Sequence, residues 1–404
     1  MVPTLSRFIQ GYRKLVEARQ KSDKERYQRL KEEKQQQGEA EPTEDPFAYR
    51  PVKVAIIDNG IMSISPQPQD RSLGGGGSHT NNDLVRVATL QREAKQEDQD
   101  RGEGGRTLWS RIEKGQSFVD DESKVSPWLF ASHPHGTQMA NLICAIDPMC
   151  QLHVAKVADG RYGTTPLRVQ KAVKWARDNQ VDIISMSFTI TEMPPGLEEE
   201  LNGADRDGIL LLCSAHDEGY NVADAFPADH PQTTTIAACD EYGGLLRNLA
   251  ESKYQFAVLG SNVAAGKIPF VESTESITGS SAATAIAAGL SSLLLSCERL
   301  AFTDGATPNS RLPQDKRAKT PARVKEYFKT QMLSKAPAPD APAGFEGKYP
   351  KYIVISKFGG IDTRLRDGED TYAAGTEQTY AQGIVTHHFQ EHFERAARKI
   401  ERQQ

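Results

Sequence analysis

Short apolar runs alternate with amphipathic segments through much of this chain, and this alternation restricts its fold more than any other feature. The apolar runs have the length of strands and lie at residues 52–58, 151–158, 181–188, 208–215 and 232–240. Segments with helical spacing of their apolar positions lie at residues 136–146, 167–179 and 196–207. Near-continuous apolar strands between amphipathic helices are typical of a parallel sheet that is covered on both sides. We therefore predict an α/β fold, with a mostly parallel β-sheet and helices on both faces.

A further helix is predicted after the turn Thr278-Gly279-Ser280-Ser281, and this helix is apolar all round. A helix of that kind is usually buried in the centre of a protein. Its two serines could cap the helix, because a Ser oxygen accepts hydrogen bonds from the first N–H groups. A serine at such a turn could equally serve as a nucleophile.

Three polar residues lie beside glycines at the boundaries of predicted elements, where ligands of parallel sheets commonly bind. Asp58 ends the first strand, His135 precedes a helix and Ser281 opens the last helix. A carboxylate, an imidazole and a hydroxyl form the set that nucleophilic acyl transfer requires. Each residue taken singly also has a structural explanation, as a turn, a helix start or a helix cap.

The blocks AIIDNG, HGTQMA and TGSSAATAIAAGL occur in this order and resemble the three blocks of subtilisin-like serine peptidases. The resemblance covers roughly residues 50–300 and is closest to the subtilase domains of fungal intracellular multidomain proteins. It implies a subtilisin-like fold and a serine endopeptidase that works through an acyl-enzyme. It makes Asp58 the orienting acid, His135 the general base and Ser281 the nucleophile. His133, the other imidazole of the HPH sequence, is interpreted as a surface residue.

Two departures from the family pattern lie near the expected site. Asp217 stands where the family often has an Asn that donates to the oxyanion, and an ionised carboxylate can only accept. The resemblance therefore implies weak turnover, or a protonated Asp217, with a faster Asp217→Asn variant. Ser187, Phe188 and Ala215 are implied to line the substrate site, and Thr189 replaces a glycine there. The alternative function is a catalytically weak or inactive subtilisin-like module used for binding or regulation.

An esterase of the α/β-hydrolase type is disfavoured. The serine turn at residues 279–283 lacks the second glycine of G-x-S-x-G, and only histidines of the tail follow it. We expect no cofactor and no metal at the active site. A structural calcium ion is common in the family that the chain resembles, but no acidic loop here can be assigned to one. His387, His388 and His392 are interpreted as the polar face of a helix rather than as metal ligands.

Composition narrows the partners and the compartment. The chain has 404 residues and a formal net charge of -5, which does not favour nucleic-acid binding. Its 5 cysteines, mostly inside apolar runs, indicate buried thiols in a reducing compartment. No basic segment followed by an apolar one opens the chain, and no uninterrupted apolar run is long enough to span a bilayer. We expect an intracellular, cytoplasmic protein with a polypeptide substrate, no nucleic acid and no membrane.

The character of the chain changes at both ends. Residues 1–47 are expected to form an amphipathic helix followed by a charged linker, and residues 48–361 the peptidase domain. A polar tract at about 63–115 is expected to be a disordered insertion, so that deleting residues 66–114 would change stability little. Residues 362–404 are expected to form a polar tail with a C-terminal helix that carries Phe389 and Phe393. Either terminal helix could contact a protein partner, and the N-terminal helix could instead pack on the chain's own domain.

Overall fold

The structure is a computed structural model, and its contacts divide the chain into two compact units. It describes residues 3–40, 49–61, 108–119, 128–129, 131–160, 163–217, 224–247, 249–266, 275–302, 320–334, 352–361 and 375–393. One unit, here the sheet unit, comprises residues 53–290 and 336–352. The other, here the helical unit, comprises residues 1–52, 291–335 and 353–404.

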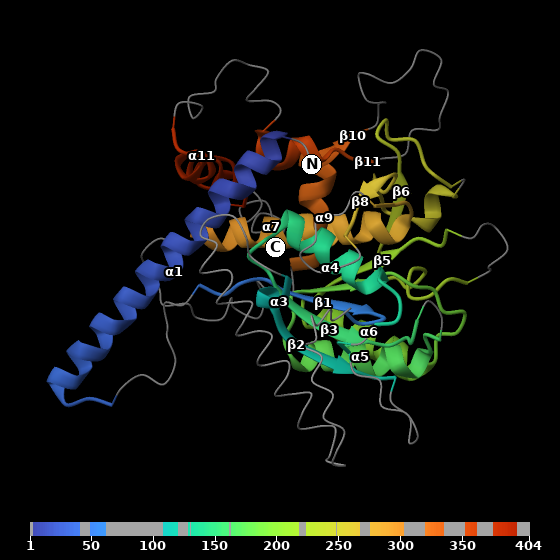
Figure 1. Cartoon of the computed structure of the whole chain (residues 1–404), viewed down its shortest axis with the longest axis horizontal. Helices are drawn as coiled ribbons and strands as arrows, with labels where there is room; N and C mark the ends of the chain where they lie inside the picture. Colours follow the sequence, from blue (N-terminus) through green and yellow to red (C-terminus); the bar gives the residue numbers. More distant parts are fainter. Residues whose placement is uncertain are drawn as a thin grey trace, which may run out of the picture. The chain divides into compact units, whose positions relative to one another are not determined.

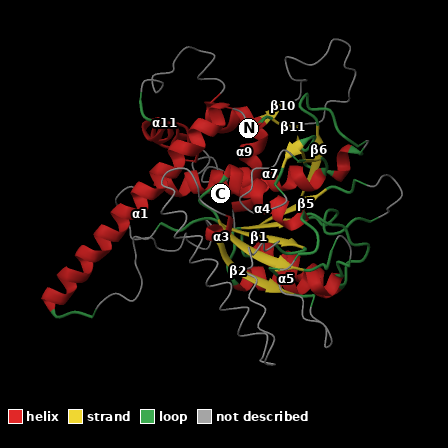
Figure 2. Cartoon of the chain, in the orientation of Figure 1, coloured by secondary structure: helices red, strands yellow, loops and turns green. Residues whose placement is uncertain are grey.

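A parallel β-sheet forms the centre of the sheet unit (Figure 2). Its strands are β1 (Lys53–Asp58), β2 (Ile112–Ser117), β3 (Gln151–Lys156), β4 (Ile183–Met186), β5 (Leu210–Ser214), β6 (Thr234–Cys239), β7 (Phe256–Leu259) and β11 (Tyr352–Ile353), whose Tyr352 belongs to this unit. They lie in the order β11-β7-β6-β5-β4-β1-β3-β2. Val54 in the central strand β1 is opposite Leu152 on one side and Ile183 on the other. The short apolar runs of the sequence are therefore buried strands of this sheet, as predicted.

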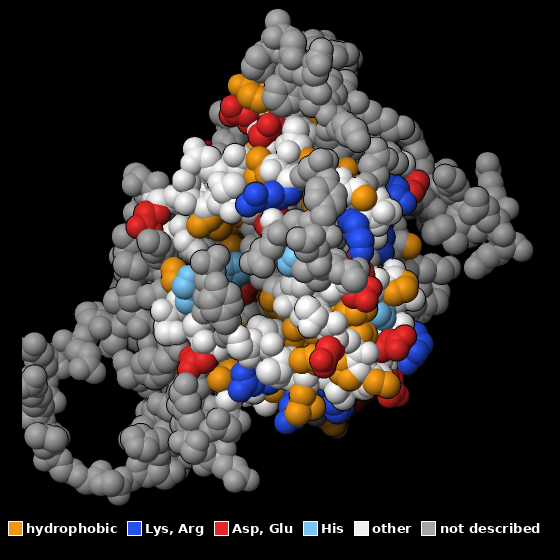
Figure 3. Space-filling model, turned by 90° about the vertical axis from the view of Figure 1, so that its right-hand side faces the viewer, with side chains coloured by type: hydrophobic (Ala, Val, Ile, Leu, Met, Phe, Trp, Pro, Cys, Tyr) orange, Lys and Arg blue, Asp and Glu red, His pale blue; other side chains and the backbone are white. Residues whose placement is uncertain are grey.

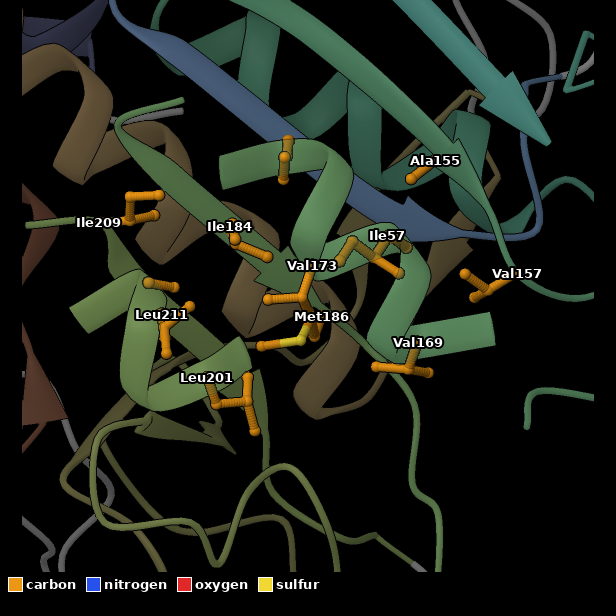
Figure 4. Close-up of a cluster of buried hydrophobic side chains, with 14 of the residues drawn as sticks. Ile57, Ala155, Val157, Val169, Val173, Ile184, Met186, Leu201, Ile209 and Leu211 are labelled. Carbon is orange, nitrogen blue, oxygen red and sulfur yellow. The ribbon is translucent and has the colours of Figure 1, made fainter. Parts of the chain in front are cut away.

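Helices cover both faces of this sheet (Figure 1). One face carries α5 (Pro166–Asp178) and α6 (Pro195–Arg206), and the other carries α4 (His135–Ile146) and the first part of α7 (Ser280–Phe302). Side chains of α5 and α6 pack on those of β1, β3, β4 and β5 in one buried cluster that includes Val173, Leu201 and Ile184 (Figure 4). Gly289 lets α7 approach α4, because a Cβ at this position would lie 3.1 Å from the Ile143 carbonyl oxygen. The predicted α/β fold is confirmed.

The smaller elements of the sheet unit lie near its strand ends. They are α3 (Leu108–Arg111), η2 (Glu251–Lys253), β8 (Val263–Ala264) and β9 (Ser276–Ile277). Strands β8 and β9 pair antiparallel, and β9 leads directly into the serine turn that precedes α7. This pairing anchors the chain just before the two serines.

The end of the polar tract is ordered, which differs from our expectation of disorder up to residue 115. Helix α3 and strand β2 occupy residues 108–117, and β2 pairs parallel with β3. Leu108 and Ile112 are each only 4% exposed. Because β2 is an edge strand, most of its other residues are exposed, and its composition looks like that of a solvated loop. Residues 62–107 lie outside the described residues, so the rest of that expectation stays a prediction.

The helical unit brings together segments from the two ends of the chain. It contains α1 (Pro3–Gln37), α9 (Thr320–Tyr327), η3 (Phe328–Met332), β10 (Leu333–Ser334), η4 (Ile355–Gly360), α11 (Glu377–Gly383), η5 (Ile384–Phe389) and the second part of α7. Aromatic rings form its core, with centroids 5.9 Å apart for Phe8 and Phe358 and 5.4 Å apart for Phe358 and Phe389. A Cβ at Gly11 would collide with the Glu377 carbonyl, so glycine allows α1 to lie against α11. The described apolar faces of these terminal segments are therefore covered within the chain itself, and residues 394–404 lie outside the described residues.

Helix α1 is longer than the sequence suggests. We expect a charged linker after about residue 20, whereas the helix continues to Gln37. The charged segment contains strong helix formers and pairs one turn apart, such as Arg19 with Asp23 at 2.8 Å. Lys31 also lies over the ring of Tyr27, 4.9 Å from its centroid. These local interactions extend a helix that composition alone would end earlier.

Helix α7 and the cysteines are largely buried. Among the described residues, one helix, at Ser280–Ala301, is long and apolar enough to cross a membrane, although the sequence suggests none. The apolar window of this helix is 94% buried inside the protein, as is usual for a core helix. All five cysteines are free thiols, and each is buried except Cys144, which is half-buried. The interpretation of the cysteines as buried thiols is confirmed for these four.

Candidate active site

The first candidate residue, Asp58, lies at the carboxyl end of the central strand. Its side chain is 7% exposed, and its backbone carbonyl accepts a hydrogen bond from the Val157 N–H at 2.8 Å. The strand reaches this position inside the sheet because residues 54–57 are all apolar and buried. Asp58 is therefore a carboxylate held at the carboxyl ends of the strands, where parallel sheets present ligand sites.

The imidazole of His135 pairs with this carboxylate. Its Nδ1 atom lies 2.9 Å from both Oδ1 and Oδ2 of Asp58. A carboxylate can only accept, so Nδ1 carries the proton and Nε2 is the basic atom of the ring. His135 is the first residue of α4, and its side chain is 27% exposed. The pair thus joins a buried acid to an imidazole that is partly exposed.

Asn59 holds the strand and the helix together, and our sequence analysis does not single it out. Its Oδ1 accepts a hydrogen bond from the Gly136 N–H at 2.9 Å. Its Nδ2 donates to the carbonyls of His133 at 3.0 Å and Gly160 at 3.2 Å. The signal for it in the sequence is its place between Asp58 and Gly60, in the turn that ends β1. Asn59 fixes the beginning of α4 and hence the position of the imidazole.

Two glycines allow this close approach. Gly60 has a φ of +90°, a conformation that L side chains rarely adopt. A Cβ at Gly136 would lie 2.8 Å from Asn59 Oδ1 and 3.3 Å from Asp58 Oδ1, so any larger residue would push the helix away. The glycines beside Asp58 and His135 are therefore requirements of the packing.

His133 differs from the surface residue that we expect. It is half-buried, and its Nδ1 accepts a hydrogen bond from the His135 N–H at 3.3 Å. Its ring centroid lies 6.4 Å from that of His135. His133 therefore helps to cap the first turn of α4, which otherwise has unsatisfied N–H groups.

The two adjacent serines have different surroundings. Ser280 is fully buried, whereas Ser281, the second residue of α7, is half-buried. Gly279 has a φ of +146°, and its N–H donates to the Gly260 carbonyl at 2.9 Å, which fixes the turn before the helix. The hydrogen bonds between described residues join Asp58 to His135, but they do not join Ser281 to His135.

Asp217 lies in the turn after β5 and contacts the residue before Ser281. Its Oδ2 accepts from the Ser280 N–H at 2.7 Å, and its Oδ1 accepts from the Ser280 hydroxyl at 2.6 Å. Both carboxylate oxygens thus accept hydrogen bonds from Ser280, and the expected place of Asp217 at the oxyanion stays a prediction. The pairing depends on the turn before α7, which a sequence pattern does not reveal.

The expected substrate-binding residues follow two neighbouring strands. Ser187 and Phe188 come directly after β4, and Ala215 comes directly after β5, at the same end of the sheet as Asp58. The Ser187 hydroxyl is buried and has no hydrogen-bond partner in the described part of the chain. Phe188 is half-buried and packs against the core under α5 and α6. Thr189 Oγ1 lies 3.3 Å from His216 Nδ1, so the side chains of Thr189 and His216 meet beside these residues.

The fold and the Asp–His pair define a class of protein. A parallel sheet that carries a buried carboxylate on an imidazole, with a serine at the start of a buried helix, is typical of hydrolases that use a serine nucleophile. The sequence profile of the subtilase family, peptidase S8, matches residues 50–307. The chain belongs to the subtilase family and has the subtilisin-like fold.

Individual relatives are similar to this chain over only part of its length. The chain is 30% identical over 142 residues to a thermostable alkaline protease of Halalkalibacterium halodurans, a match covering 33% of this chain and 38% of that protein. It is 30% identical over 122 residues to the major intracellular serine protease of Bacillus subtilis, covering 28% and 38%. It is 28% identical over 177 residues to the subtilisin-like protease het-Q2 of Podospora anserina, covering 40% and 48%. The chain thus spans less than half the length of each of these relatives.

Proposed function

We propose that this chain is a serine endopeptidase in which Asp58 orients His135, His135 is the general base and Ser281 is the nucleophile. The observation that carries the proposal is the distance of 2.9 Å from His135 Nδ1 to both oxygens of Asp58. A carboxylate in this position selects the tautomer with a basic Nε2 and stabilises the imidazolium that forms when Nε2 takes a proton.

The reaction that follows from these roles has two halves. His135 Nε2 removes the proton from the Ser281 hydroxyl as Oγ attacks the carbonyl carbon of a peptide bond. The tetrahedral intermediate collapses to an ester on Ser281, and His135 gives the proton to the leaving amine. Water then attacks the ester with the same base, which releases the second product and restores the serine. The Ser281 backbone N–H at the start of α7 is the proposed donor to the oxyanion.

The proposed substrate is a polypeptide that binds along the carboxyl ends of β4 and β5, beside Ser187, Phe188 and Ala215. Substrates of parallel sheets bind at this end, which supports the assignment. The chemistry requires no cofactor. Figure 3 shows acidic and basic side chains interspersed on the face that it presents, which supports a reaction partner other than nucleic acid. An intracellular, cytoplasmic location is part of the proposal, as is the absence of a membrane partner.

A second candidate function is a catalytically weak subtilisin-like module used for binding or regulation. The observation that favours it is the carboxylate of Asp217 on Ser280, one residue from the proposed nucleophile. A negative charge there opposes the charge that develops on the oxyanion. The contact between Thr189 and His216 adds bulk beside the proposed substrate site.

Labelling with a fluorophosphonate, followed by mass-spectrometric mapping of the labelled residue, tests the proposal. We expect a single adduct on Ser281 and none in Ser281→Ala, with the fold retained because Ala is a good helix residue. A peptide should be cleaved in preference to a simple ester. A folded wild-type protein that takes no label would favour the binding module, and an adduct on Ser280 would move the assignment by one residue.

A further inference from the structure

We propose that Asp217 is a positioning residue that fixes Ser281 through Ser280 and does not serve as an oxyanion donor. The inference rests on the proposed function, because it concerns how the nucleophile is held. It assigns the negative charge beside the serine a purpose other than the one that the family pattern implies.

The contacts between Asp217 and Ser280 use both oxygens of the carboxylate. The backbone N–H and the side-chain O–H of Ser280 each donate to a different oxygen, at 2.7 and 2.6 Å. The Ser280 Oγ in turn accepts from the Ala238 N–H at 3.1 Å. Ser280 is therefore held from β6 and from the turn after β5 at once, and it is fully buried between them.

The residues around Ser281 are consequently fixed on both sides. Gly279 donates its N–H to the Gly260 carbonyl at 2.9 Å, and Thr284 donates its hydroxyl to the Ser280 carbonyl at 2.7 Å. A Cβ at Gly279 would lie 3.0 Å from Asp217 Oδ2, so the glycine gives the carboxylate room to reach Ser280. A serine that follows such a constrained residue has little freedom in the direction of its Cα–Cβ bond.

The charge of Asp217 suits this role better than an amide would. Ser280 offers two donors, and an ionised carboxylate accepts both, whereas an Asn side chain has one acceptor oxygen and an NH₂ group that donates. A negative charge is also favoured at the N-terminus of a long helix such as α7. Hydrogen bonds to a carboxylate are among the stronger ones in proteins. The same carboxylate has no proton to donate to an oxyanion.

The two roles of Asp217 predict opposite effects of one substitution. If Asp217 positions Ser280, Asp217→Asn leaves a Ser280 donor without an acceptor, and we expect kcat to fall about tenfold or more with KM nearly unchanged. If Asp217 faces the oxyanion, the new amide would supply a donor and kcat would rise. A rise in kcat for Asp217→Asn overturns the proposal.

Variants at position 280 test the route through Ser280. Ser280→Ala should lose activity to a similar degree, and Ser280→Thr should keep most of it because the hydroxyl remains. Asp217→Asn combined with Ser280→Ala should be little worse than either single variant, since both remove the same contact. Multiplied losses in the double variant, or full activity in Ser280→Ala, would contradict the inference. If Asp217→Asn does not fold, the pair Ser280→Ala and Ser280→Thr still gives the comparison.

Stability measurements separate this inference from the proposed function. Urea unfolding of the wild type, the two single variants and the double variant measures the Asp217–Ser280 coupling without any turnover. If Asp217 and Ser280 are coupled but the wild-type protein takes no label, the proposed function is contradicted. The contact between the two residues would then be confirmed, without a catalytic role. Labelling at Ser281 without coupling would sink the positioning role alone.

Discussion

His135 Nδ1 lies 2.9 Å from each of the two carboxylate oxygens of Asp58, so the imidazole is shared between them. Replacing Asp58 with Asn would keep the size of the side chain but offer a donor as well as an acceptor to the ring. The ring could then turn to the tautomer whose Nε2 carries the proton and cannot act as a base.

We expect Asp58→Asn to lower kcat by about 10³–10⁴-fold, as for other aspartates of this kind, while the protein remains folded. Steady-state hydrolysis of a peptide and circular dichroism check this. A variant with near wild-type kcat would show that Asp58 does not orient the base.

Asn59 makes one hydrogen bond to the Gly136 N–H, one to the His133 carbonyl before α4 and one to the Gly160 carbonyl after β3. Each is worth about 1 kcal/mol, so Asn59→Ala should lower the free energy of unfolding by about 2–3 kcal/mol. It should also lower kcat, because the start of α4 carries His135. Asn141→Ala is a matched control, since it removes from the same helix a single hydrogen bond, to the Gly266 carbonyl. Equal losses in urea unfolding for the two variants would argue against a special role for Asn59.

His153 should make the stability of the protein depend on pH. Its side chain is fully buried, and neither ring nitrogen has a hydrogen-bond partner among the described residues. Burial, with smaller contributions from the charges of Lys53 and Lys114, lowers its pKa from 6.5 to about 4. Between these two pKa values, His153 is protonated in the unfolded chain but neutral in the folded chain. The stability is present above pH 6.5 and is lost as the pH falls toward 4, by about 3 kcal/mol in total.

The His153→Leu and His153→Phe variants have nothing to titrate at this position. Between pH 4 and 6.5 their free energy of unfolding should change less than that of the wild type, whatever their absolute stability. Urea unfolding at several pH values measures this slope. A slope parallel to that of the wild type would mean that His153 is not the source.

Two deletions in the polar tract should differ in their effect on stability, although composition alone predicts the same small effect for both. Deleting residues 66–106 leaves α3 and β2 in place and should change stability little, because the segment is too polar to bury a core. Deleting residues 66–114 also removes Leu108 and Ile112, both buried. Burial of an aliphatic side chain is worth about 1.5–3 kcal/mol, so the longer deletion should cost about 3–6 kcal/mol more. Thermal or urea unfolding of both variants would settle the difference, and equal stabilities would show that β2 adds nothing.

The sequence predicts the elements that carry the site better than it predicts their contacts. Strand β1 ends at Asp58 as expected, and α4 begins at His135, one residue before its predicted start, because an unbroken apolar run and a glycine-marked helix start are local signals. The contact of Asp217 with Ser280 has no such signal. It requires two residues 63 positions apart to meet, one in the turn after the end of β5 and the other at the beginning of α7. The contacts of Asn59 lack a local signal for the same reason, since its partners His133, Gly136 and Gly160 lie 74 to 101 positions away along the chain.

Composition also misjudges elements at the edge of the fold. Strand β2 looks like a loop because Ile112 alone among its residues is buried, and the charged part of α1 looks like a linker because few of its residues are buried. In both cases the backbone hydrogen bonds, rather than an apolar face, continue the element. Burial is the property that hydrophobic patterns report, so regular structure with little burial escapes them.

The packing of α1 against the other end of the chain has a consequence for biosynthesis. The rings of Phe8 and Phe389 lie with their centroids 6.5 Å apart, yet the second residue leaves the ribosome long after the first. At about 5–20 residues per second, the intervening chain takes on the order of 20–80 s to make. During that time the ring of Phe389 is not yet available to pack on Phe8. The helical unit is therefore completed only after translation has passed residue 389, and α1 must stay available for packing until then.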